Sequence, residues 1–479
     1  MKIEIDVINP ITSTISKADA ELIQPCIEWE AQWVDLLCKE CGKAYKMKDG
    51  KGPKKLCPDC NGFGLKQFHK YTKNAFTNTA RNSVRTFPTG LIHRILEYAQ
   101  FKGIEVDVYE DESFECPWQE PHLIGITPRP DQIKQIQEAL MEGRGVLTAP
   151  TGTGKTILSA MLFSAYMDKD FKGLFLAHTI DLVRQAAKEF KKFGFKVTTV
   201  GEGEVDFKGT IVVSTIQTFI NHVKNYSDVF YCIIVDEVHH VVSATYQKIF
   251  NTVLTPHRYG FSASPKKDIE SQILTESAIG PMISELSWKE AQELELLAKP
   301  KLKLLNCPDI IGIEGLNPKG QYRMGIVNNV DRNTLIAKTA RDMANENKSM
   351  IVFVSYNDQG IAIQDILRAM GIDAPFAHGG IKGKEREQII DDMENKRILI
   401  TVANIVFKEG INIRTLDSVF LAGGFGMGDT QIIQSIGRNL RKHPDKEQAY
   451  IFDIIDRFGS NLIRHSMHRV HHYINLDLI

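Results

Sequence analysis

The chain has 479 residues, enough for about three domains at roughly 150 residues each. Hydrophobic residues make up 43% and charged residues 24%, which excludes a disordered or fibrous chain and fits a globular protein. The formal net charge of -1 gives no argument for or against nucleic acid as a partner. No apolar run approaches the ~18 residues that cross a bilayer, and the opening MKIEIDVINP is unlike a secretory signal, so we expect no membrane segment.

Residues 1–125 form a first region with its own charge pattern. KIEIDVI alternates as a strand, 89–103 has apolar residues at helical spacing before a glycine, and IEVDVYED alternates again. Residues 38–102 hold fourteen Lys or Arg against four Asp or Glu, whereas 105–120 hold seven acidic residues and no basic one. This indicates either a basic module followed by an acidic connector or a solvated charged surface.

Four of the eight cysteines form two close pairs, Cys38-x-x-Cys41 and Cys57-x-x-Cys60, with fifteen residues between them. This spacing is typical of a tetrahedral four-thiolate Zn²⁺ site, and the metal would replace the core that so short a segment lacks. We predict a structural zinc ribbon over about 36–64; free cysteines are the alternative. The scattered remaining cysteines fit a reducing cytoplasm better than a disulfide framework.

From residue 126 onward, strand, loop and helix alternate. TPRPDQ predicts a turn into a helix, followed by the apolar strands GVLTA, GLFLAH, TIVVST and YCIIVDE. A second series, SMIVFVS, APFAH, RILITV and SVFLAG, begins near residue 348. Such alternation predicts parallel sheets covered by helices. The fold class is therefore α/β, with one unit over 126–298, a second over 299–479, and an N-terminal α+β domain that contains the zinc ribbon.

The stretch APTGTGKT, residues 149–156, lies between a strand and a helix. Glycines let backbone N–H groups approach a phosphate, and a helix N-terminus adds a favourable dipole. Ala149 replaces the first glycine of the P-loop pattern, whereas its last three positions match. We expect Lys155 to contact the β- and γ-phosphates of ATP and Thr156 to bind Mg²⁺. The candidate phosphate-binding residues are Thr151, Gly152, Thr153, Gly154, Lys155 and Thr156.

The stretch DEVHH begins where an apolar strand ends. Carboxylates there lie at the carboxyl edge of an open α/β sheet, where ligands bind. Asp236 would hold Mg²⁺, directly or through water, and Glu237 would orient or deprotonate the attacking water. An exposed turn is the alternative for such a pair.

The ordered series of motifs resembles superfamily 2 helicases and translocases. RPDQ (Arg129, Gln132) resembles the adenine-reading motif, FLAHTIDLVRQ motif Ia, VVSTIQTF motif Ib, and DEVHH a DExH-type motif II. FSASP resembles motif III with Ser264 where Thr is usual, and VFVSY resembles motif IV. TVANIVFKEGINI resembles motif V with Asn412 where Asp is common, and QIIQSIGRNLRK resembles motif VI. The resemblance covers about 126–457 and implies two tandem RecA-like lobes.

The resemblance also implies that catalysis needs both lobes. Arg438 and Arg441, three apart on one helical face, would reach across to ATP and stabilise charge on the γ-oxygens. A surface ion pair is the alternative for either arginine. Gln434 joins the catalytic candidates, and Gly410 joins the nucleotide-binding ones. ATP binding would close the lobes and hydrolysis would let them separate.

Strand-binding residues in this family come from motifs Ia, Ib, IV and V. Hydroxyls, backbone amides and helix N-termini position a strand without reading its bases. A cap or turn residue is the alternative at each position. The candidates are Thr215, Ser355, His378, Gly379 and Thr401.

QSIGRNLR resembles the Q-x-x-G-R-x-x-R pattern of DNA-directed enzymes, including excision-repair helicases and UvsW-type phage branch-migration helicases. Lysines and aromatic residues are interleaved through 39–73, as in a domain that grips a DNA arm, although the rings could form the ribbon's core. We expect a monomeric cytoplasmic ATP hydrolase that remodels branched or double-stranded DNA in replication, recombination or repair. The alternatives are a DExH RNA helicase and an ATP-switched binding module without unwinding; Glu237, Arg438 and Arg441 argue against the latter.

Overall fold

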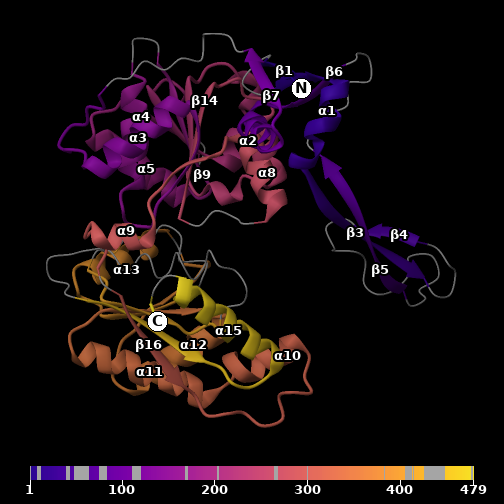
Figure 1. Ribbon diagram of the computed structural model, residues 1–479. Coiled ribbons are helices and arrows are strands. Elements are labelled where there is room, and N and C mark those ends of the chain that lie inside the picture. Colours follow the sequence, from indigo (N-terminus) through magenta and orange to yellow (C-terminus); the bar gives the residue numbers. More distant parts are fainter. Residues whose placement is uncertain are drawn as a thin grey trace.

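The structure is a computed structural model. It describes residues 2–7, 12–38, 44–47, 64–74, 84–109, 120–167, 171–201, 204–263, 268–298, 300–381, 383–404, 413, 415–424, 448–475 and 478–479. Figure 1 shows an N-terminal domain beside one α/β lobe, with a second α/β lobe that carries the C-terminus. We use lobe 1 for residues 120–298 and lobe 2 for residues 300–479.

The N-terminal domain is built on a four-stranded sheet in the order β6-β2-β1-β7. Its core is mostly aliphatic and includes Ile3, Ile5 and Ile95, all fully buried. Its last helix ends at Gly103 in the left-handed conformation, φ +67°, as the glycine stop in the sequence predicts. The elements are β1 (Lys2–Val7), β2 (Thr12–Ser16), α1 (Lys17–Ile23), β6 (Val84–Pro88), α2 (Ile92–Lys102) and β7 (Glu105–Tyr109).

A three-stranded antiparallel sheet projects from this domain (Figure 1). β3 (Glu28–Cys38) pairs with β5 (Gly64–Asn74) along its whole length, so that Cys38 lies opposite Gly64, and β4 (Ala44–Met47) pairs with the other edge of β3. Cys41, Cys57 and Cys60 lie outside the described residues, so the zinc ribbon stays a prediction.

Lobe 1 has an eight-stranded sheet in the order β11-β10-β12-β9-β13-β14-β8-β15. All its strand pairs are parallel except β10 with β11, which confirms the parallel sheet expected from the alternation of strands and helices. The strands are β8 (Arg144–Thr148), β9 (Gly173–Ala177), β10 (Val197–Gly201), β11 (Glu204–Val205), β12 (Ile211–Thr215), β13 (Cys232–Val235), β14 (His257–Ser262) and β15 (Met282–Glu285).

Helices cover both faces of this sheet (Figure 1). Along β13, Ile234 packs into one core and Ile233 into the other, because successive side chains of a strand point to opposite faces. The first core includes side chains of α3 (Pro130–Glu142), α4 (Lys155–Ala165) and α5 (Ile180–Lys192). The second core includes side chains of α6 (Ile216–Phe219), α7 (Ala244–Phe250) and α8 (Ile269–Ala278).

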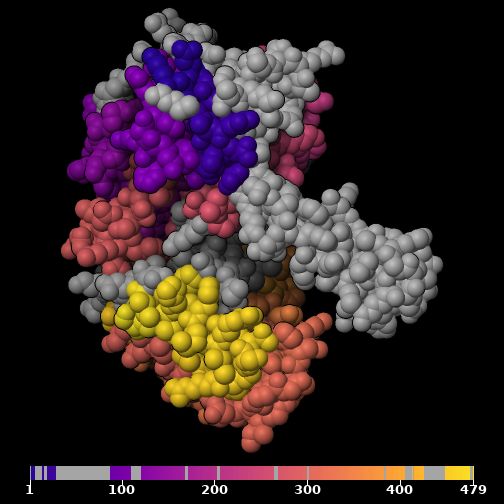
Figure 2. All heavy atoms as spheres, turned by 45° about the vertical axis from the view of Figure 1, so that its right-hand side comes forward, coloured from indigo at the N-terminus to yellow at the C-terminus, as the bar shows by residue number. Residues whose placement is uncertain are grey.

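Lobe 2 has a six-stranded sheet in the order β16-β21-β20-β17-β19-β18, parallel throughout. Its strands are β16 (Pro300–Asn306), β17 (Met350–Val354), β18 (Phe376–Ala377), β19 (Ile400–Asn404), β20 (Ser418–Leu421) and β21 (Ala449–Ile455). Its helices are α10 (Pro318–Tyr322), α11 (Val330–Asn345), α12 (Asn357–Ala369), α13 (Gly383–Glu394) and α15 (Ser460–Asn475), which Figure 2 shows in yellow on the surface.

The two lobes are in contact. Ala149, at the end of β8, and Ala291, in α9 (Trp288–Glu293), belong to the same apolar core as lobe 2 residues such as Phe353. On the surface, Asp181 of α5 lies 3.1 Å from Arg386 of α13. The N-terminal domain contacts lobe 1 through α8, as described below.

Among the described residues, no helix combines the length and the hydropathy that a membrane span requires.

Candidate nucleotide and strand site

The P-loop occupies the turn between β8 and α4. Gly152 and Gly154 have φ values of +96° and +105°, a region that side chains rarely adopt. A Cβ atom at Gly154 would lie 2.8 Å from the Gln132 side-chain nitrogen, so the Gln132 amide would have to shift. Thr153 closes the turn by donating its hydroxyl to the Pro150 carbonyl at 2.8 Å.

Lys155 begins α4 and turns its ammonium inward. Its Nζ atom is buried and has no hydrogen-bond partner among the described residues. A buried ammonium is costly unless a charged or polar group satisfies it, so this position suits an anionic ligand. Thr156 follows on the first turn of the same helix.

Arg129 and Gln132 lie against the P-loop. The Arg129 guanidinium donates to the Thr153 carbonyl at 2.9 Å and forms a two-bond ion pair with Asp131. The Gln132 side-chain oxygen accepts from the Arg129 backbone N–H at 3.1 Å. Its amide nitrogen is buried without a partner in the described part of the chain, which leaves a donor for the edge of a base.

Asp236 and Glu237 follow β13 at the carboxyl edge of the sheet. Burial raises the pKa of Asp236 to about 6, helped by the Glu237 carboxylate and opposed by the Lys155 ammonium. Glu237 has a left-handed backbone, φ +52°, and its N–H donates to the Asp236 carboxylate at 3.0 Å. Asp236 therefore interacts electrostatically with both Glu237 and Lys155 at one edge of the sheet.

His239 connects this pair to the end of β14. Its Nδ1 atom lies 3.4 Å from the Glu237 carboxylate and 3.4 Å from the Ser262 hydroxyl. Burial lowers the pKa of His239 to about 4, so its ring is neutral at pH 7. Ser262 belongs to the motif III stretch, so motifs II and III are in direct contact, which the separate motifs did not predict.

Several predicted site residues are not placed by the structure. Gly410, Gln434, Arg438 and Arg441 lie outside the described residues, so their roles remain predictions. Within the described ranges, no group of three or more His, Cys, Asp or Glu side chains is arranged to hold a metal ion.

Three of the five strand-binding candidates, Ser355, His378 and Gly379, are at least partly exposed, whereas Thr215 is buried. Thr215 caps α6 by accepting from the Thr218 N–H at 3.2 Å. Ser355 follows β17 and is half-buried, and His378 and Gly379 follow β18. Thr401 differs, because it lies inside β19 with a fully buried side chain. We correct that expectation: Thr401 has no surface for a phosphate to contact in this structure.

Comparisons with known proteins agree with the motifs. Residues 125–267 match the family described as "Type III restriction enzyme, res subunit", and residues 332–443 match the "Helicase conserved C-terminal domain".

Two curated relatives are similar to about two thirds of this chain. The "DNA 3'-5' translocase XPB2" of Sulfurisphaera tokodaii is 26% identical over 362 residues, 68% of this chain and 81% of that protein. The "ATP-dependent DNA helicase uvsW" of Enterobacteria phage T4 is 25% identical over 349 residues, 70% and 69% of the two chains.

A solved structure supports the fold. The Saccharomyces cerevisiae protein Dbp5, determined with RNA and ADP BeF3, superposes with a TM-score of 0.53 and 15% identity over 74% of this chain and 93% of its own. With the two domain matches and the ordered motifs, we conclude that the chain belongs to the superfamily 2 helicases and translocases.

Proposed function

We propose that this protein is an ATP-dependent DNA helicase or translocase that unwinds or remodels branched DNA, by fork reversal or branch migration. One observation carries the ATPase part. The Lys155 ammonium is buried, lacks a hydrogen-bond partner among the described residues, and acts electrostatically on the Asp236 carboxylate at the sheet edge. A triphosphate supplies the anion that this arrangement requires.

The chemistry follows from the side chains present. Lys155 and the P-loop amides bind the β- and γ-phosphates. The Asp236 carboxylate, desolvated beside Lys155, and the Thr156 hydroxyl are oxygen donors of the kind that Mg²⁺ prefers, and they would hold it. Bound Mg²⁺ offsets the charge on the phosphate oxygens. Glu237 orients the attacking water and accepts its proton, and the neutral His239 ring lies 3.4 Å from its carboxylate.

Two observations favour DNA as the substrate. The stretch QSIGRNLR follows the pattern of DNA-directed enzymes. The two curated relatives are named as a DNA translocase and a DNA helicase. We further propose that Cys38, Cys41, Cys57 and Cys60 bind Zn²⁺ and that the projecting arm grips a duplex or a junction.

The test is steady-state ATP hydrolysis without nucleic acid and with forks, four-way junctions, tailed duplexes or RNA duplexes. We expect DNA to stimulate hydrolysis, with branched DNA the best activator and unwinding substrate. Stimulation by RNA alone would favour the RNA helicase alternative. Unchanged hydrolysis with every nucleic acid would contradict a motor of any kind.

A Glu237→Gln variant tests the assigned roles. It should bind ATP and DNA but hydrolyse ATP at least about 100-fold more slowly, because a positioned general base contributes this much or more. The matched control is Glu189→Gln in α5, whose carboxylate pairs with Lys192 on the surface. It should behave as the parent protein does; full activity of Glu237→Gln would remove Glu237 from the mechanism.

A further inference from the structure

Four charged side chains lie where helix α5 of lobe 1 meets helix α13 of lobe 2. The Arg386 guanidinium is 3.1 Å from the Asp181 carboxylate, and the Arg184 guanidinium is 3.9 Å from the Glu387 carboxylate. Arg184 also lies 3.7 Å from Asp181, within α5. We call these four residues the interlobe cluster. Each lobe contributes one acid and one base, so the two helix surfaces are complementary in charge.

The position of Arg386 depends on its partner in the other lobe. Asp181 lies in the first turn of α5, where the helix dipole favours an acid. Arg386 is the fourth residue of α13 and lies near the N-terminus of that helix, where a cation is disfavoured. The Asp181 carboxylate offsets this cost. Because the Arg386 side chain is only 22% exposed, water screens the pair less than it screens a fully exposed one.

Helix α13 also connects the interlobe cluster to the nucleotide site. Ile389 and Met393 of α13 are buried in the apolar core that contains Ala149, the first residue of the P-loop. The helix that forms the ion pair with lobe 1 therefore packs against the core to which the P-loop belongs. A change in how α13 meets α5 should reach the P-loop through this core.

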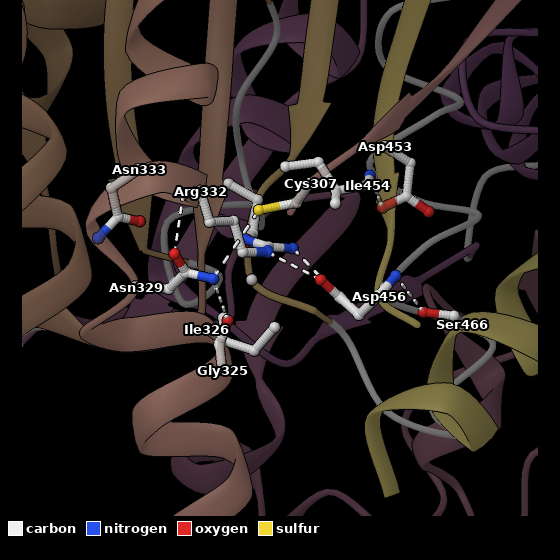
Figure 3. Close-up of polar contacts among 12 residues, drawn as sticks. Cys307, Gly325, Ile326, Asn329, Arg332, Asn333, Asp453, Ile454, Asp456 and Ser466 are labelled. Atoms are coloured by element: carbon white, nitrogen blue, oxygen red, sulfur yellow. Dashed lines mark hydrogen bonds and ion pairs between the residues drawn. The ribbon is translucent and has the colours of Figure 1, made fainter. Parts of the chain in front are cut away.

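Buried ion pairs hold lobe 2 together as one body. The Arg332 Nε atom of α11 lies 3.0 Å from the carboxylate of Asp456, which directly follows β21, and both side chains are buried (Figure 3). Arg469 of α15 donates to Asp453 of β21 at 2.8 Å, and this pair is also buried. Breaking a buried pair costs more than separating partly exposed charges. The lobes should therefore separate at the interlobe cluster before lobe 2 itself comes apart.

We propose that Asp181 and Arg386 are positioning residues for ATP hydrolysis, because their ion pair holds the two lobes in the arrangement that binds nucleotide. The inference rests on the proposed function, since it concerns the ATP site. In this arrangement the P-loop presents the buried Lys155 ammonium to an anion. Apparent affinity for a ligand falls with the fraction of molecules in the competent arrangement, and the interlobe cluster raises that fraction.

The test is ATP hydrolysis without DNA by the parent protein and by Asp181→Lys, which sets three cations against the single carboxylate of Glu387. We expect KM for ATP to rise about threefold to tenfold. We expect kcat to stay within about twofold of the parent value, because saturating nucleotide restores the competent arrangement. Added salt should shrink the difference in KM, because it screens partly exposed charges.

A second charge reversal tests whether the effect is electrostatic. Asp181→Lys combined with Arg386→Glu gives α5 two cations and α13 two carboxylates, so the helix surfaces are complementary again. KM should return to within about twofold of the parent value. Damage to the fold would not be repaired by a second substitution of this kind, and thermal unfolding of each variant checks the fold directly.

Asp331→Lys is the matched control. Asp331 is an exposed acid in the first turn of α11, on the side of lobe 2 that faces away from lobe 1 (Figure 1). The substitution changes the same charge at the same place in a helix, but away from the lobe boundary. This variant should keep the parent KM.

Four results would overturn the inference alone. They are a parent or lowered KM in Asp181→Lys, an equal rise in Asp331→Lys, no recovery in the double variant, and a difference in KM that salt does not reduce. ATP hydrolysis that no nucleic acid stimulates would overturn the proposed motor and leave this test valid. Absence of saturable ATP hydrolysis in the parent protein would overturn both.

Discussion

Glu237 follows the end of the apolar strand β13 and has a left-handed backbone conformation. This conformation costs a residue with a side chain roughly 1 kcal/mol or more. The backbone N–H of Glu237 donates to the Asp236 carboxylate, and the Glu237 carboxylate lies 3.4 Å from Nδ1 of His239. Because His239 also reaches Ser262 at the end of β14, the strained residue is held between two strand ends.

His257 gives the residue-scale prediction, which concerns pH. It is almost fully buried, it stacks on Tyr166 with ring centroids 4.4 Å apart, and its Nδ1 atom lies 3.1 Å from the Gly143 carbonyl. Burial lowers its pKa from 6.5 to about 4, and the Arg144 charge acts in the same direction. The folded protein thus keeps the ring neutral where the unfolded chain binds a proton.

The contribution of His257 to the free energy of unfolding is complete above pH 6.5 and is lost as the pH falls toward 4. From pH 7.5 to pH 5 the loss is about 2 kcal/mol. Denaturant unfolding of the parent and His257→Gln at both pH values measures it. The parent should lose more stability on acidification than the variant does; equal losses would show that His257 is not protonated selectively in the unfolded chain.

At the scale of elements, the alternating apolar strands of both lobes could be predicted because each is short, continuous and followed by a helical pattern. β14 could not, since HRYGFS carries a histidine and an arginine inside the sheet. Arg258 is tolerated there because it donates to backbone carbonyls near the ends of α7 and α8, including Val253 at 2.6 Å and Ala278 at 3.0 Å. Only the tertiary structure reveals those acceptors.

Some residues of the candidate site could likewise be predicted from the sequence and others could not. The sequence locates Lys155, Asp236 and Glu237, because each occupies a fixed place relative to a strand end. It does not reveal the contact of His239 with Ser262, because those partners are 23 positions apart. The long pairing of β3 with β5 was also missed, since GLKQFHKYTKN contains few apolar residues to mark a strand.

The element-scale prediction concerns α8, which joins the N-terminal domain to lobe 1. Arg94 of α2 forms two hydrogen bonds with Glu276 of α8, at 2.5 and 2.7 Å, and both side chains are largely buried. A double-mutant cycle with Arg94→Ala and Glu276→Ala should give a coupling of about 1–3 kcal/mol in unfolding free energy.

A surface pair within the N-terminal domain provides the comparison. Lys2 and Asp107 are 2.7 Å apart and considerably more exposed. Their cycle should give less than about 1 kcal/mol. If the two cycles give equal values, the Arg94–Glu276 pair does not hold the N-terminal domain in place.

The prediction at the scale of the whole molecule concerns zinc. It distinguishes an arm that a bound metal stabilises from an arm whose cysteines are free. The purified protein should contain about one Zn²⁺ per chain by elemental analysis, and replacing Cys57 and Cys60 by serine should abolish it. We expect this variant to keep basal ATP hydrolysis, which lobes 1 and 2 perform, and to bind a four-way junction more weakly. Substitution of Cys232, a buried cysteine of β13, should leave the zinc content unchanged.

Ala149 occupies the first position of the P-loop, yet its methyl group belongs to the apolar core that lobe 2 shares. A ligand or motion that rearranges this shared core must therefore also affect the P-loop, which lies beside it. Thermodynamic linkage makes the effect reciprocal. If a second ligand that separates or tilts the lobes changes the affinity for nucleotide by some factor, nucleotide changes the affinity for that ligand by the same factor. Paired titrations of nucleotide and DNA would measure the coupling that this shared core leads us to expect.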